Sequence, residues 1–461
     1  MIPDDLTRAL AAMLGDRLST GKSDLALHGR SETWHPEMPP DAVAYPETTA
    51  EVAEVVRLCA ARGVPVIGWG TGTALEGHAS APRGGVTVDF RRMDRVLEVL
   101  EEDMLVRVQP GCTRVRLNEE LRATGLMFPV DPGADASVGG MASTRASGTT
   151  ALRYGTMRDH VRGLEVVLAD GRAIRTGGVS GGLARKSSAG YDLTSLFVGA
   201  EGTLGLITEL TLKLHGQPEA VAAAVCAFPD TASAIGCVID ATAMGIVPAR
   251  CEFVDAATVA ILNDLDGAGL PVGPHLLLEF HGSDAGVAEA AERFGAAATD
   301  RGGAGYAWAT EAEARTRLWD MRHRAYHTIL RSRPGSTAVV TDVCVPVSRL
   351  GEAIERAAAA VAASPIPGPI LGHVGDGNYH AILLVDRDRP EELEEAKRLS
   401  DAMVRDAQAL GGTATGEHGV GLGKLHHMEA EHGAAWDVMG LVKRALDPEG
   451  VMNPGKLVRG N

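Results

Sequence analysis

Aromatic residues are scarce in this sequence of 461 residues, and positive charge is outweighed by negative charge. Phenylalanine, tyrosine and tryptophan make up 4%, and 44 lysines and arginines stand against 60 aspartates and glutamates, a net charge of −16. Nucleic-acid binding needs clustered cations, and proteins that bind single strands stack the bases on aromatic rings. We therefore expect no nucleic-acid partner.

Cysteines and long apolar runs are also few. The six cysteines are scattered and none belongs to a CxxC pair, which is typical of buried thiols in a reducing compartment. No apolar run reaches the roughly 18 residues of a membrane span, and the start, MIPDDLTRAL, resembles neither a signal peptide nor a mitochondrial presequence. We therefore expect a cytoplasmic protein, and peripheral contact with a membrane stays open.

The order of helix and strand patterns indicates an α+β protein with more than one domain. A chain of this length exceeds the roughly 250–300 residues at which a single hydrophobic core stops growing. The patterns indicate a helix at 48–63, strands at 64–68 and 85–90, and hairpins that turn at Glu102-Asp103 and Asp170-Gly171. A strand ends at a proline-containing turn near 215–220, which indicates a boundary there. The tail from Met428 contains a helix and a turn-rich end, so we divide the chain into 1–218, 219–427 and 428–461.

Three segments rich in small residues point to a ligand. The first, Gly68–Gly77, follows a predicted strand, and its small residues let backbone N–H groups approach a phosphate. A dinucleotide-binding Rossmann loop must continue directly into a helix, whereas residues 78–85 contain a proline and two glycines. We therefore reject a Rossmann site, and this loop alone is also compatible with a surface turn.

The second segment, residues 131–156, is long and shows no amphipathic pattern. A flexible linker is the bland alternative, but Met141, Leu152 and Tyr154 are unusual in linkers. The third segment, 199–208, enters a strand. Three such segments in one region favour a long cofactor that is held at several points.

Two later segments combine histidines with a carboxylate. His373 and His380 are seven residues apart, which places them on opposite faces of a straight strand, but the Gly-Asp-Gly-Asn turn between them can fold the chain back. Glu417 and His418 are adjacent and point apart. We assign His373, His380 and Glu417 to a zinc or manganese ion and His418 to the substrate. Asp376 is expected to cap the turn, and hydrogen-bonded structural histidines are the alternative.

Six segments resemble the FAD-linked D-lactate dehydrogenases, which belong to the group with the vanillyl-alcohol-oxidase type of FAD domain. They are 65–77, 128–163, 185–214, 371–385, 415–424 and 451–458. The run VDPGADASVGGMAS, followed by RYGTMRD, is the most specific part. The resemblance implies a vanillyl-alcohol-oxidase-type FAD-binding domain of two α+β subdomains at 1–218 and an α+β substrate or cap domain with an antiparallel sheet at 219–427. The segment 428–461 is then expected to return to the FAD domain.

The resemblance also implies an extended FAD, bound non-covalently. Its binding residues are then Trp69, Gly70, Thr71, Gly72, Thr73, Ala74, Leu75, Gly77, His78, Pro132, Gly133, Ser137, Gly139, Gly140, Thr144, Ser147, Gly148, Glu201, Gly202, Gly205, Ile207 and Asn453. His78 is a departure, because relatives usually have glycine there. Histidine is a site of covalent flavin attachment in the wider group, but relatives in this branch bind FAD non-covalently.

The same resemblance supports the three metal ligands and His418 as the catalytic base, and it indicates Arg322 as the residue that orients the substrate carboxylate. Imidazole has a reference pKa of ~6.5 and can accept a hydroxyl proton near neutral pH. Ile382 stands two residues after His380, where relatives that oxidise 2-hydroxyglutarate carry a polar residue. An apolar side chain cannot pair a second carboxylate, so D-lactate is favoured, and glycolate and other 2-hydroxy acids stay open.

The expected reaction is oxidation of a D-2-hydroxy acid to the 2-oxo acid by FAD and the metal. The resemblance implies an external electron acceptor, which is a cytochrome, a quinone or an electron-transfer flavoprotein, and a homodimer is compatible with the sequence. Two rival interpretations remain. A metal-dependent hydrolase leaves the small-residue segments unexplained, and a non-catalytic flavin-binding module leaves the histidines unexplained.

Overall fold

A computed structural model describes residues 2–459 and divides the chain into two compact units. The first comprises Met1–Ser147, Gly155–Gln217 and Glu417–Asn461, and the second comprises Gly148–Tyr154 and Pro218–Gly416. The sequence-based division placed 417–427 with the substrate domain. In the structure this segment packs within the first unit, because its amides bond to Glu76 and Glu201 there.

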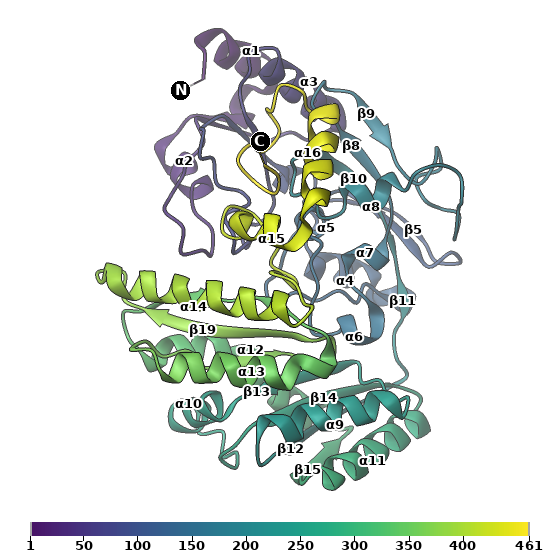
Figure 1. Cartoon of the computed structure of the whole chain (residues 1–461). Coiled ribbons are helices and arrows are strands. Elements are labelled where there is room, and N and C mark those ends of the chain that lie inside the picture. Colours follow the sequence, from purple (N-terminus) through teal and green to yellow (C-terminus); the bar gives the residue numbers. More distant parts are fainter. Residues whose placement is uncertain (1, 460–461) are drawn as a thin grey trace. The chain divides into compact units, whose positions relative to one another are not determined.

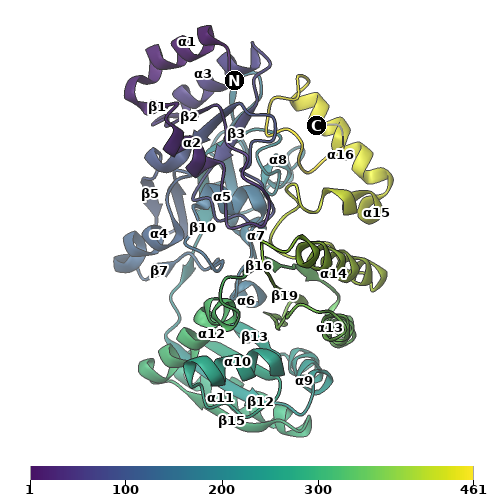
Figure 2. The ribbon, with the colours of Figure 1, turned by 90° about the vertical axis from the view of Figure 1, so that its left-hand side faces the viewer.

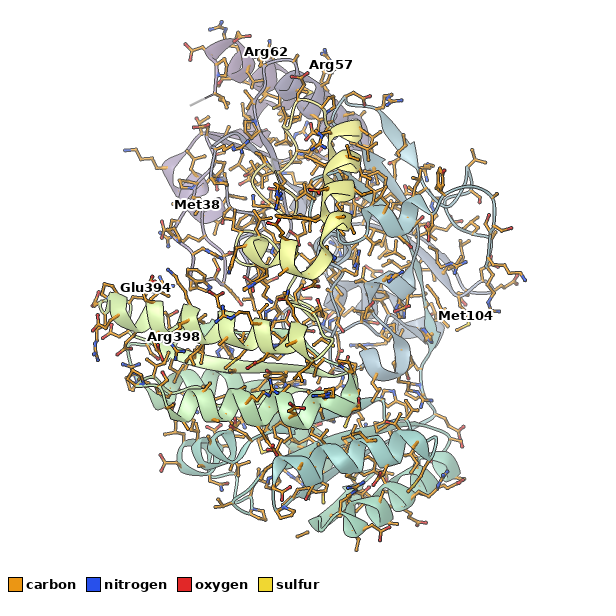
Figure 3. The ribbon with its side chains drawn as sticks, in the orientation of Figure 1. Met38, Arg57, Arg62, Met104, Glu394 and Arg398 are labelled. Carbon is orange, nitrogen blue, oxygen red and sulfur yellow. The ribbon has the colours of Figure 1, made fainter. Side chains whose placement is uncertain are left out.

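A small mixed sheet forms one half of the first unit. Its strand order is β1 (Leu18–Ser19), β2 (Ala42–Ala44), β4 (Val86–Asp89) and β3 (Val66–Trp69), and β2, β4 and β3 are parallel. Helix α3 (Thr49–Ala60) begins at Thr48, whose side chain accepts a hydrogen bond from Glu51 N. Its buried residues have the helical spacing seen in the sequence, and they share a core with α1 (Asp4–Leu14). Figure 3 labels Arg62, just after α3, whose Nε donates to Asp5 of α1 at 2.7 Å.

An antiparallel sheet forms the other half of the first unit. Its order is β5 (Val96–Leu100), β6 (Leu105–Val108), β10 (Leu206–Lys213), β8 (Val161–Val167) and β9 (Ala173–Arg175). Both predicted hairpins are present, as β5–β6 and β8–β9. The core of this half includes Leu117 from α4 (Arg114–Leu121) and Met141 from α5 (Val138–Thr144), with Leu210 from β10. The two subdomains of the predicted FAD-binding domain are thus confirmed.

Helix α5 was not foreseen. It lies in the small-residue segment, yet Val138, Met141 and Ala142 are fully buried. The remaining elements of the first unit are α2 (Lys22–His28), β7 (Leu126–Met127), α7 (Met157–His160), α8 (Leu193–Phe197), β11 (His215–Gly216), α15 (Met428–His432), α16 (Ala434–Leu446) and 3-10 turns at Gly15–Arg17, Phe90–Arg92, Arg122–Thr124 and Leu425–His427. Figure 1 shows α15 and α16 in yellow.

The second unit is built on an eight-stranded sheet in which all pairings are antiparallel. The strand order is β15 (Ala304–Ala309), β12 (Ala220–Ala227), β14 (His275–Gly282), β13 (Arg250–Val254), β18 (Ile370–His373), β19 (Asn378–Val385) and β16 (Thr337–Val340), and β17 (Val343–Cys344) also pairs with β19. The predicted antiparallel cap domain is therefore confirmed. Every residue of β19 is buried, which requires cover on both faces of the sheet.

Two groups of helices provide this cover. Helices α11 (Asp284–Asp300), α9 (Thr231–Ala243), α13 (Val347–Ala362) and α14 (Pro390–Ala409) contact one another in that order, and α14 also contacts β19 (Figure 1). Helices α10 (Ala256–Asp266) and α12 (Ala312–Ser332) pack together on an apolar cluster that includes Trp319, Leu371 and Ile382 (Figure 2). The short helix α6 (Ala151–Tyr154) contacts β13.

All six cysteines are free thiols, five of them buried, as the sequence suggested. Within residues 2–459, none of the helices combines the length and the apolar character needed to cross a membrane.

Candidate active site

The glycine-rich loop that follows β3 closely approaches the start of α5. A Cβ on Gly70 would lie 2.2 Å from the Ser137 Oγ, and one on Gly72 (φ +76°) would lie 2.5 Å from the Trp69 ring. Ser137 is the residue at which α5 begins, and its buried hydroxyl has no hydrogen-bond partner among the residues that the structure describes. The loop therefore needs glycine for two close approaches, and it leaves a polar atom for a ligand to satisfy.

His78, Glu201 and Asn453 form a buried cluster that joins the loop to the C-terminal tail. The Nε2 of His78 lies 3.2 Å from Glu201 Oε1. The Asn453 side-chain amide donates to the backbone oxygens of His78 at 3.0 Å and Glu201 at 2.6 Å. The Glu201 carboxylate accepts hydrogen bonds from the amides of Val420 and Gly421. Three segments more than 100 residues apart in sequence are thereby held together.

The buried carboxylate of Glu201 stays charged because of its partners. Burial alone would raise its pKa, but the charge and hydrogen bond of His78 and the two backbone amides outweigh this effect and lower the pKa. Glu201 (φ +52°) and Asn453 (φ +42°) both adopt the left-handed backbone conformation. Such strained residues are concentrated at functional sites, which supports the prediction that both line a ligand.

The predicted cofactor residues lie at the end of β3 (Trp69), in the loop after it (Gly70, Thr71, Gly72, Thr73, Ala74, Leu75, Gly77, His78), before α5 (Pro132, Gly133), at its start and within it (Ser137, Gly139, Gly140, Thr144), after it (Ser147, Gly148), before and within β10 (Glu201, Gly202, Gly205, Ile207) and in the tail (Asn453). Two of the glycines are needed for packing. A Cβ on Gly139 would lie 2.4 Å from Pro110 Cβ, and one on Gly205 would lie 2.7 Å from Val166 Cγ1. Ile207 is buried in the core of the antiparallel sheet, so some of the residues predicted to bind FAD also pack in the core.

The histidine hairpin is formed by β18 and β19 in the second unit. Leu371 pairs with His380 across the two strands, and Gly377 (φ +92°) lies in the turn that connects them. The rings of His373 and His380 are 5.6 Å apart, centre to centre. The turn thus folds the chain back and brings the two imidazoles together, as the sequence predicted. Asp376 Oδ1 accepts from the Asn378 amide at 3.4 Å, consistent with the predicted capping role.

Both imidazoles are held through the Nδ1 atom. The Nδ1 of His373 lies 2.6 Å from Glu252 Oε1, and the Nδ1 of His380 lies 2.9 Å from the Thr341 carbonyl oxygen. Both partners are acceptors, so each Nδ1 carries the hydrogen and each neutral ring has its lone pair on Nε2. This is the arrangement in which metal-binding histidines are oriented by a second hydrogen bond.

A local irregularity in the sheet frees the carbonyl that orients His380. The Ala381 amide donates to the Thr341 hydroxyl at 2.8 Å rather than to the Thr341 carbonyl. This exchange of acceptor interrupts the hydrogen-bond ladder along β19 at the point where its pairing with β16 ends and its pairing with β17 begins. The Thr341 carbonyl can therefore accept the hydrogen bond from His380.

Asp342 anchors the end of the second unit. Its carboxylate accepts hydrogen bonds from Asn378 Nδ2 at 2.7 Å, Thr415 Oγ1 at 2.7 Å and Gly416 N at 3.0 Å. Gly416 is the last residue of the unit, and Glu417 and His418 follow it directly. Glu417 and His418 therefore directly follow a residue whose backbone amide is fixed by Asp342.

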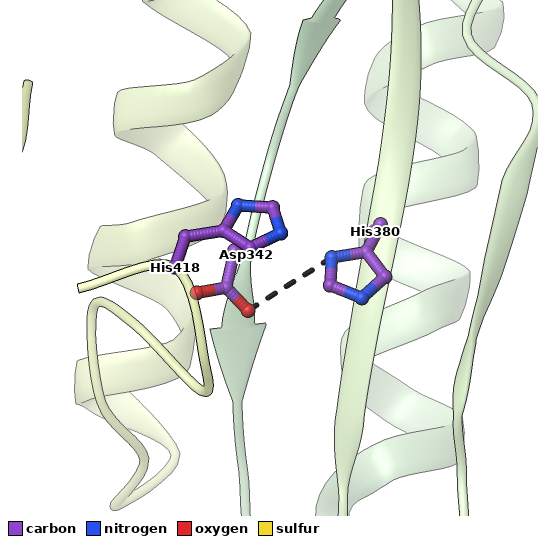
Figure 4. A group of neighbouring side chains, drawn as sticks. All are labelled: Asp342, His380 and His418. Carbon is purple, nitrogen blue, oxygen red and sulfur yellow. Dashed lines mark ion pairs between the residues drawn. The ribbon is translucent and has the colours of Figure 1, made fainter. Parts of the chain in front are cut away.

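The residues after this anchor complete two groups of potential metal ligands. One ligand atom each from His373, His380 and Glu417 lies within 4.8 Å of the others, and the same holds for Asp342, His380 and His418. Figure 4 shows the second group, with the 3.8 Å separation of His380 Nδ1 and Asp342 Oδ1 dashed. Asp342 is already engaged by three hydrogen bonds.

Arg322 lies on α12, and its nearest charged partner is a residue that the sequence reasoning missed. The Nη2 of Arg322 is 2.6 Å from Oε2 of Glu252, a fully buried residue of β13. Burial alone would raise the pKa of Glu252, but the charges and hydrogen bonds of His373 and Arg322 hold it below its usual value. A glutamate between the apolar residues Cys251 and Phe253 of a strand was the available signal, because buried acids are rare unless they are paired.

Comparison with known protein families finds two matching models, which cover different parts of the chain. The family model described as "FAD binding domain" matches residues 40–177, and the model described as "FAD linked oxidases, C-terminal domain" matches residues 217–457. These matches confirm the expected cofactor class. A flavin-free hydrolase is therefore set aside.

Relatives extend over nearly the whole chain. A probable mitochondrial D-lactate dehydrogenase of Danio rerio is 45% identical and covers 97% of this chain and 90% of its own. A mitochondrial D-lactate dehydrogenase [cytochrome] of Arabidopsis thaliana is 41% identical and covers 99% and 80%, and glycolate oxidase subunit GlcD of Bacillus subtilis is 34% identical and covers 91% and 89%. Two of these are named as mitochondrial proteins, so the expectation of a cytoplasmic protein was wrong. Composition alone did not carry that information.

Solved structures agree on the fold. The 4-ethylphenol oxidase from Gulosibacter chungangensis superposes with a TM-score of 0.82 at 19% identity and covers 99% of this chain and 97% of its own. Such low identity supports the fold alone, which is the predicted vanillyl-alcohol-oxidase type. From its matched domains and its near full-length relatives, the chain belongs to the FAD-linked oxidases and is a homologue of the D-lactate dehydrogenases among them.

Proposed function

We propose that this protein is an FAD- and divalent-metal-dependent dehydrogenase that oxidises a D-2-hydroxy acid, with D-lactate preferred, to the 2-oxo acid. One observation carries the metal dependence. The imidazoles of His373 and His380 are both held at Nδ1 and lie with the Glu417 carboxylate in a group of ligand atoms within 4.8 Å. The names of the D-lactate dehydrogenase relatives support the substrate.

The protein residues divide into those that hold a cofactor and those that act on the substrate. Two imidazoles and one carboxylate suit zinc or manganese and leave coordination positions open for a substrate. The buried cluster around Glu201 and the loop beside Ser137 fit FAD. When bound, FAD supplies the two-electron oxidation and the metal ion polarises the substrate hydroxyl.

The side chains of Arg322 and His418 perform the remaining tasks. Arg322 orients the substrate carboxylate with its planar donor set, which pairs well with carboxylates. The His418 imidazole accepts the proton of the substrate hydroxyl, because it is the side chain beside the ligand group that is not assigned to the metal. The electrons leave to an external acceptor, and the name of the Arabidopsis relative favours a cytochrome.

Ile382 supports a monocarboxylate substrate. It is 2% exposed, and it stands two residues beyond His380 in β19, in an apolar cluster with Trp319 and Leu371. Such surroundings cannot pair a second carboxylate. Glycolate is the second candidate, because one relative is a glycolate oxidase subunit.

Anaerobic reduction of the flavin tests this proposal. Purified holoprotein is mixed separately with D-lactate, glycolate and D-2-hydroxyglutarate, and the loss of flavin absorbance is followed by stopped flow. D-lactate is expected to bleach the flavin with the highest ratio of the reduction rate constant to the substrate Kd. A clear preference for the diacid would overturn the substrate assignment, and no bleaching by any 2-hydroxy acid would overturn the proposed activity.

A further inference from the structure

A single buried carboxylate connects the histidine hairpin with helix α12. Glu252 pairs directly with His373 in the register of β13 and β18. Its two oxygens have different partners, since Oε1 lies 2.6 Å from His373 Nδ1 and Oε2 lies 2.6 Å from Arg322 Nη2. One side chain therefore positions a proposed metal ligand and the proposed substrate-carboxylate residue.

Because Glu252 is buried, its carboxylate depends on both of its partners. Glu252 has no exposed surface, and the side chains of His373 and Arg322 are each 12% exposed. A buried carboxylate that loses one partner retains an uncompensated charge, which is strongly unfavourable. Loss of either His373 or Arg322 as a partner would therefore leave the Glu252 charge only partly compensated.

We propose that Glu252 is a positioning residue that couples the metal site to substrate binding. It holds His373 as the Nδ1–H tautomer, so that Nε2 is presented to the ion, and it holds the Arg322 guanidinium in one orientation. The Nε of Arg322 is buried without a hydrogen-bond partner among the described residues, so the guanidinium keeps a donor for a ligand. This inference rests on the proposed function and adds a defined link between its two parts.

The same sheet contains a matched control. Glu279 of β14 is also buried, its Oε1 lies 2.7 Å from His281 Nε2, and Arg250 pairs with it across the strands. The Nε of Arg250 is 3.4 Å from the same Glu279 oxygen. Glu279 thus has the same kinds of partner as Glu252, but neither partner belongs to the proposed site.

The test compares E252Q with E279Q in the full-length, FAD-loaded protein. Glutamine keeps the shape of glutamate, but it lacks the charge and its one oxygen cannot accept from both donors. Titration with Mn²⁺ and Zn²⁺ against a competing chelator is expected to show a roughly 10- to 100-fold higher Kd in E252Q, the usual effect of losing a residue that orients a ligand. E279Q is expected to bind metal as the wild type does, and the flavin content is expected to be unchanged in both.

Steady-state kinetics separate positioning from a general structural defect. At saturating metal, E252Q is expected to show a raised KM for D-lactate, because Arg322 has lost its anchor. A smaller folded fraction would lower kcat alone, and E279Q provides that reference. E252D is the second variant, since its shorter carboxylate cannot reach both partners, and its metal Kd is also expected to rise.

The outcomes distinguish this inference from the function on which it rests. If the wild-type protein binds neither metal, the proposed metal-dependent function fails, and the coupling fails with it. If the wild type binds metal and folded E252Q or E252D binds it equally well, the positioning role alone is wrong. A metal Kd that rises in E252Q without any change in KM would overturn the coupling to Arg322.

Discussion

Individual hydrogen bonds determine the orientation of the imidazole rings in this protein. His373 and His380 are oriented through Nδ1, one by a carboxylate and one by a carbonyl that the Thr341 hydroxyl has released from the sheet. His78 instead lies 3.2 Å from the buried Glu201 carboxylate. The three side chains are chemically identical, and their surroundings give them different partners.

Replacement of His418 tests the role of the base. His418→Ala is expected to lower kcat by about 10²-fold or more, which is the usual contribution of a positioned base. Flavin content, measured from the visible spectrum of the purified protein, is expected to remain at the wild-type level. Turnover at the wild-type rate would contradict the assignment.

Lys456 gives a pH dependence of stability. Its fully buried amine donates to the Ser80 carbonyl at 2.7 Å and to Asn453 Oδ1 at 2.6 Å. Burial lowers its pKa from 10.5 to about 7, although the charge of Glu201 opposes this shift. Between these two values the unfolded chain binds more protons than the folded one, so the free energy of unfolding rises with pH, by at most about 1.4 kcal/mol per pH unit.

Lys456→Met removes the titrating group and isolates this effect. Urea unfolding of both proteins is measured from about pH 7 to about pH 9, inside the window that the linkage relation defines. The difference in unfolding free energy between wild type and variant is expected to shift in favour of the wild type as the pH rises. A difference that is independent of pH would show that the amine titrates normally.

At the scale of elements, the segment after His418 packs tightly against the glycine-rich loop. The Leu422 amide donates to the Glu76 carbonyl at 2.7 Å, and a Cβ on Gly421 (φ +50°) would lie 2.1 Å from that carbonyl oxygen. The Gly421 amide also donates to Glu201. The segment therefore supports the loop that is predicted to bind FAD.

Gly421→Ala is expected to displace this loop. Backbone strain and the clash with Glu76 together are expected to lower the free energy of unfolding by about 1–3 kcal/mol, and the ratio of FAD to protein is expected to fall. Gly216→Ala is the control, because a Cβ at Gly216 meets nothing within 4 Å and its backbone is unstrained. Equal FAD content in both variants would mean that the loop does not depend on this contact.

At the scale of the whole molecule, most residues assigned to the two prosthetic groups belong to different units. Among the predicted FAD residues, all but Gly148 belong to the first unit. Of the proposed metal ligands, His373 and His380 belong to the second unit and Glu417 is the first residue of the last segment of the first unit. Each unit has its own sheets and apolar core. Loss of one group is therefore expected to leave the other bound.

Removal of the metal tests this independence. Dialysis against a chelator is expected to lower turnover by about 10²-fold or more, because Lewis-acid assistance contributes several kcal/mol, while the flavin stays bound. Added Zn²⁺ or Mn²⁺ is expected to restore activity. Full activity in a metal-free, FAD-loaded sample would contradict a catalytic metal.

Elements with strong local signals were predictable from the sequence. Helix α3 has a regular apolar period and Thr48 as its cap, and the hairpins β5–β6 and β8–β9 have turn residues between alternating strands. The histidine hairpin was also predictable, because the glycines between the two histidines permit the backbone conformations of a tight turn. Helix α5 was missed, since its small residues carry no amphipathic period and its core contacts come from distant strands.

The sequence by itself determined most of the local elements and the cofactor class, and it predicted the three histidines of the proposed site, because short-range periodicity, turn chemistry and characteristic motifs are present in the linear sequence. Only the tertiary structure decided that Glu252 joins His373 to Arg322 and that residues 417–427 pack with the first unit. These contacts connect positions that are 70 to more than 200 residues apart. Their energies come from burial and pairing in the folded state, which no local pattern records.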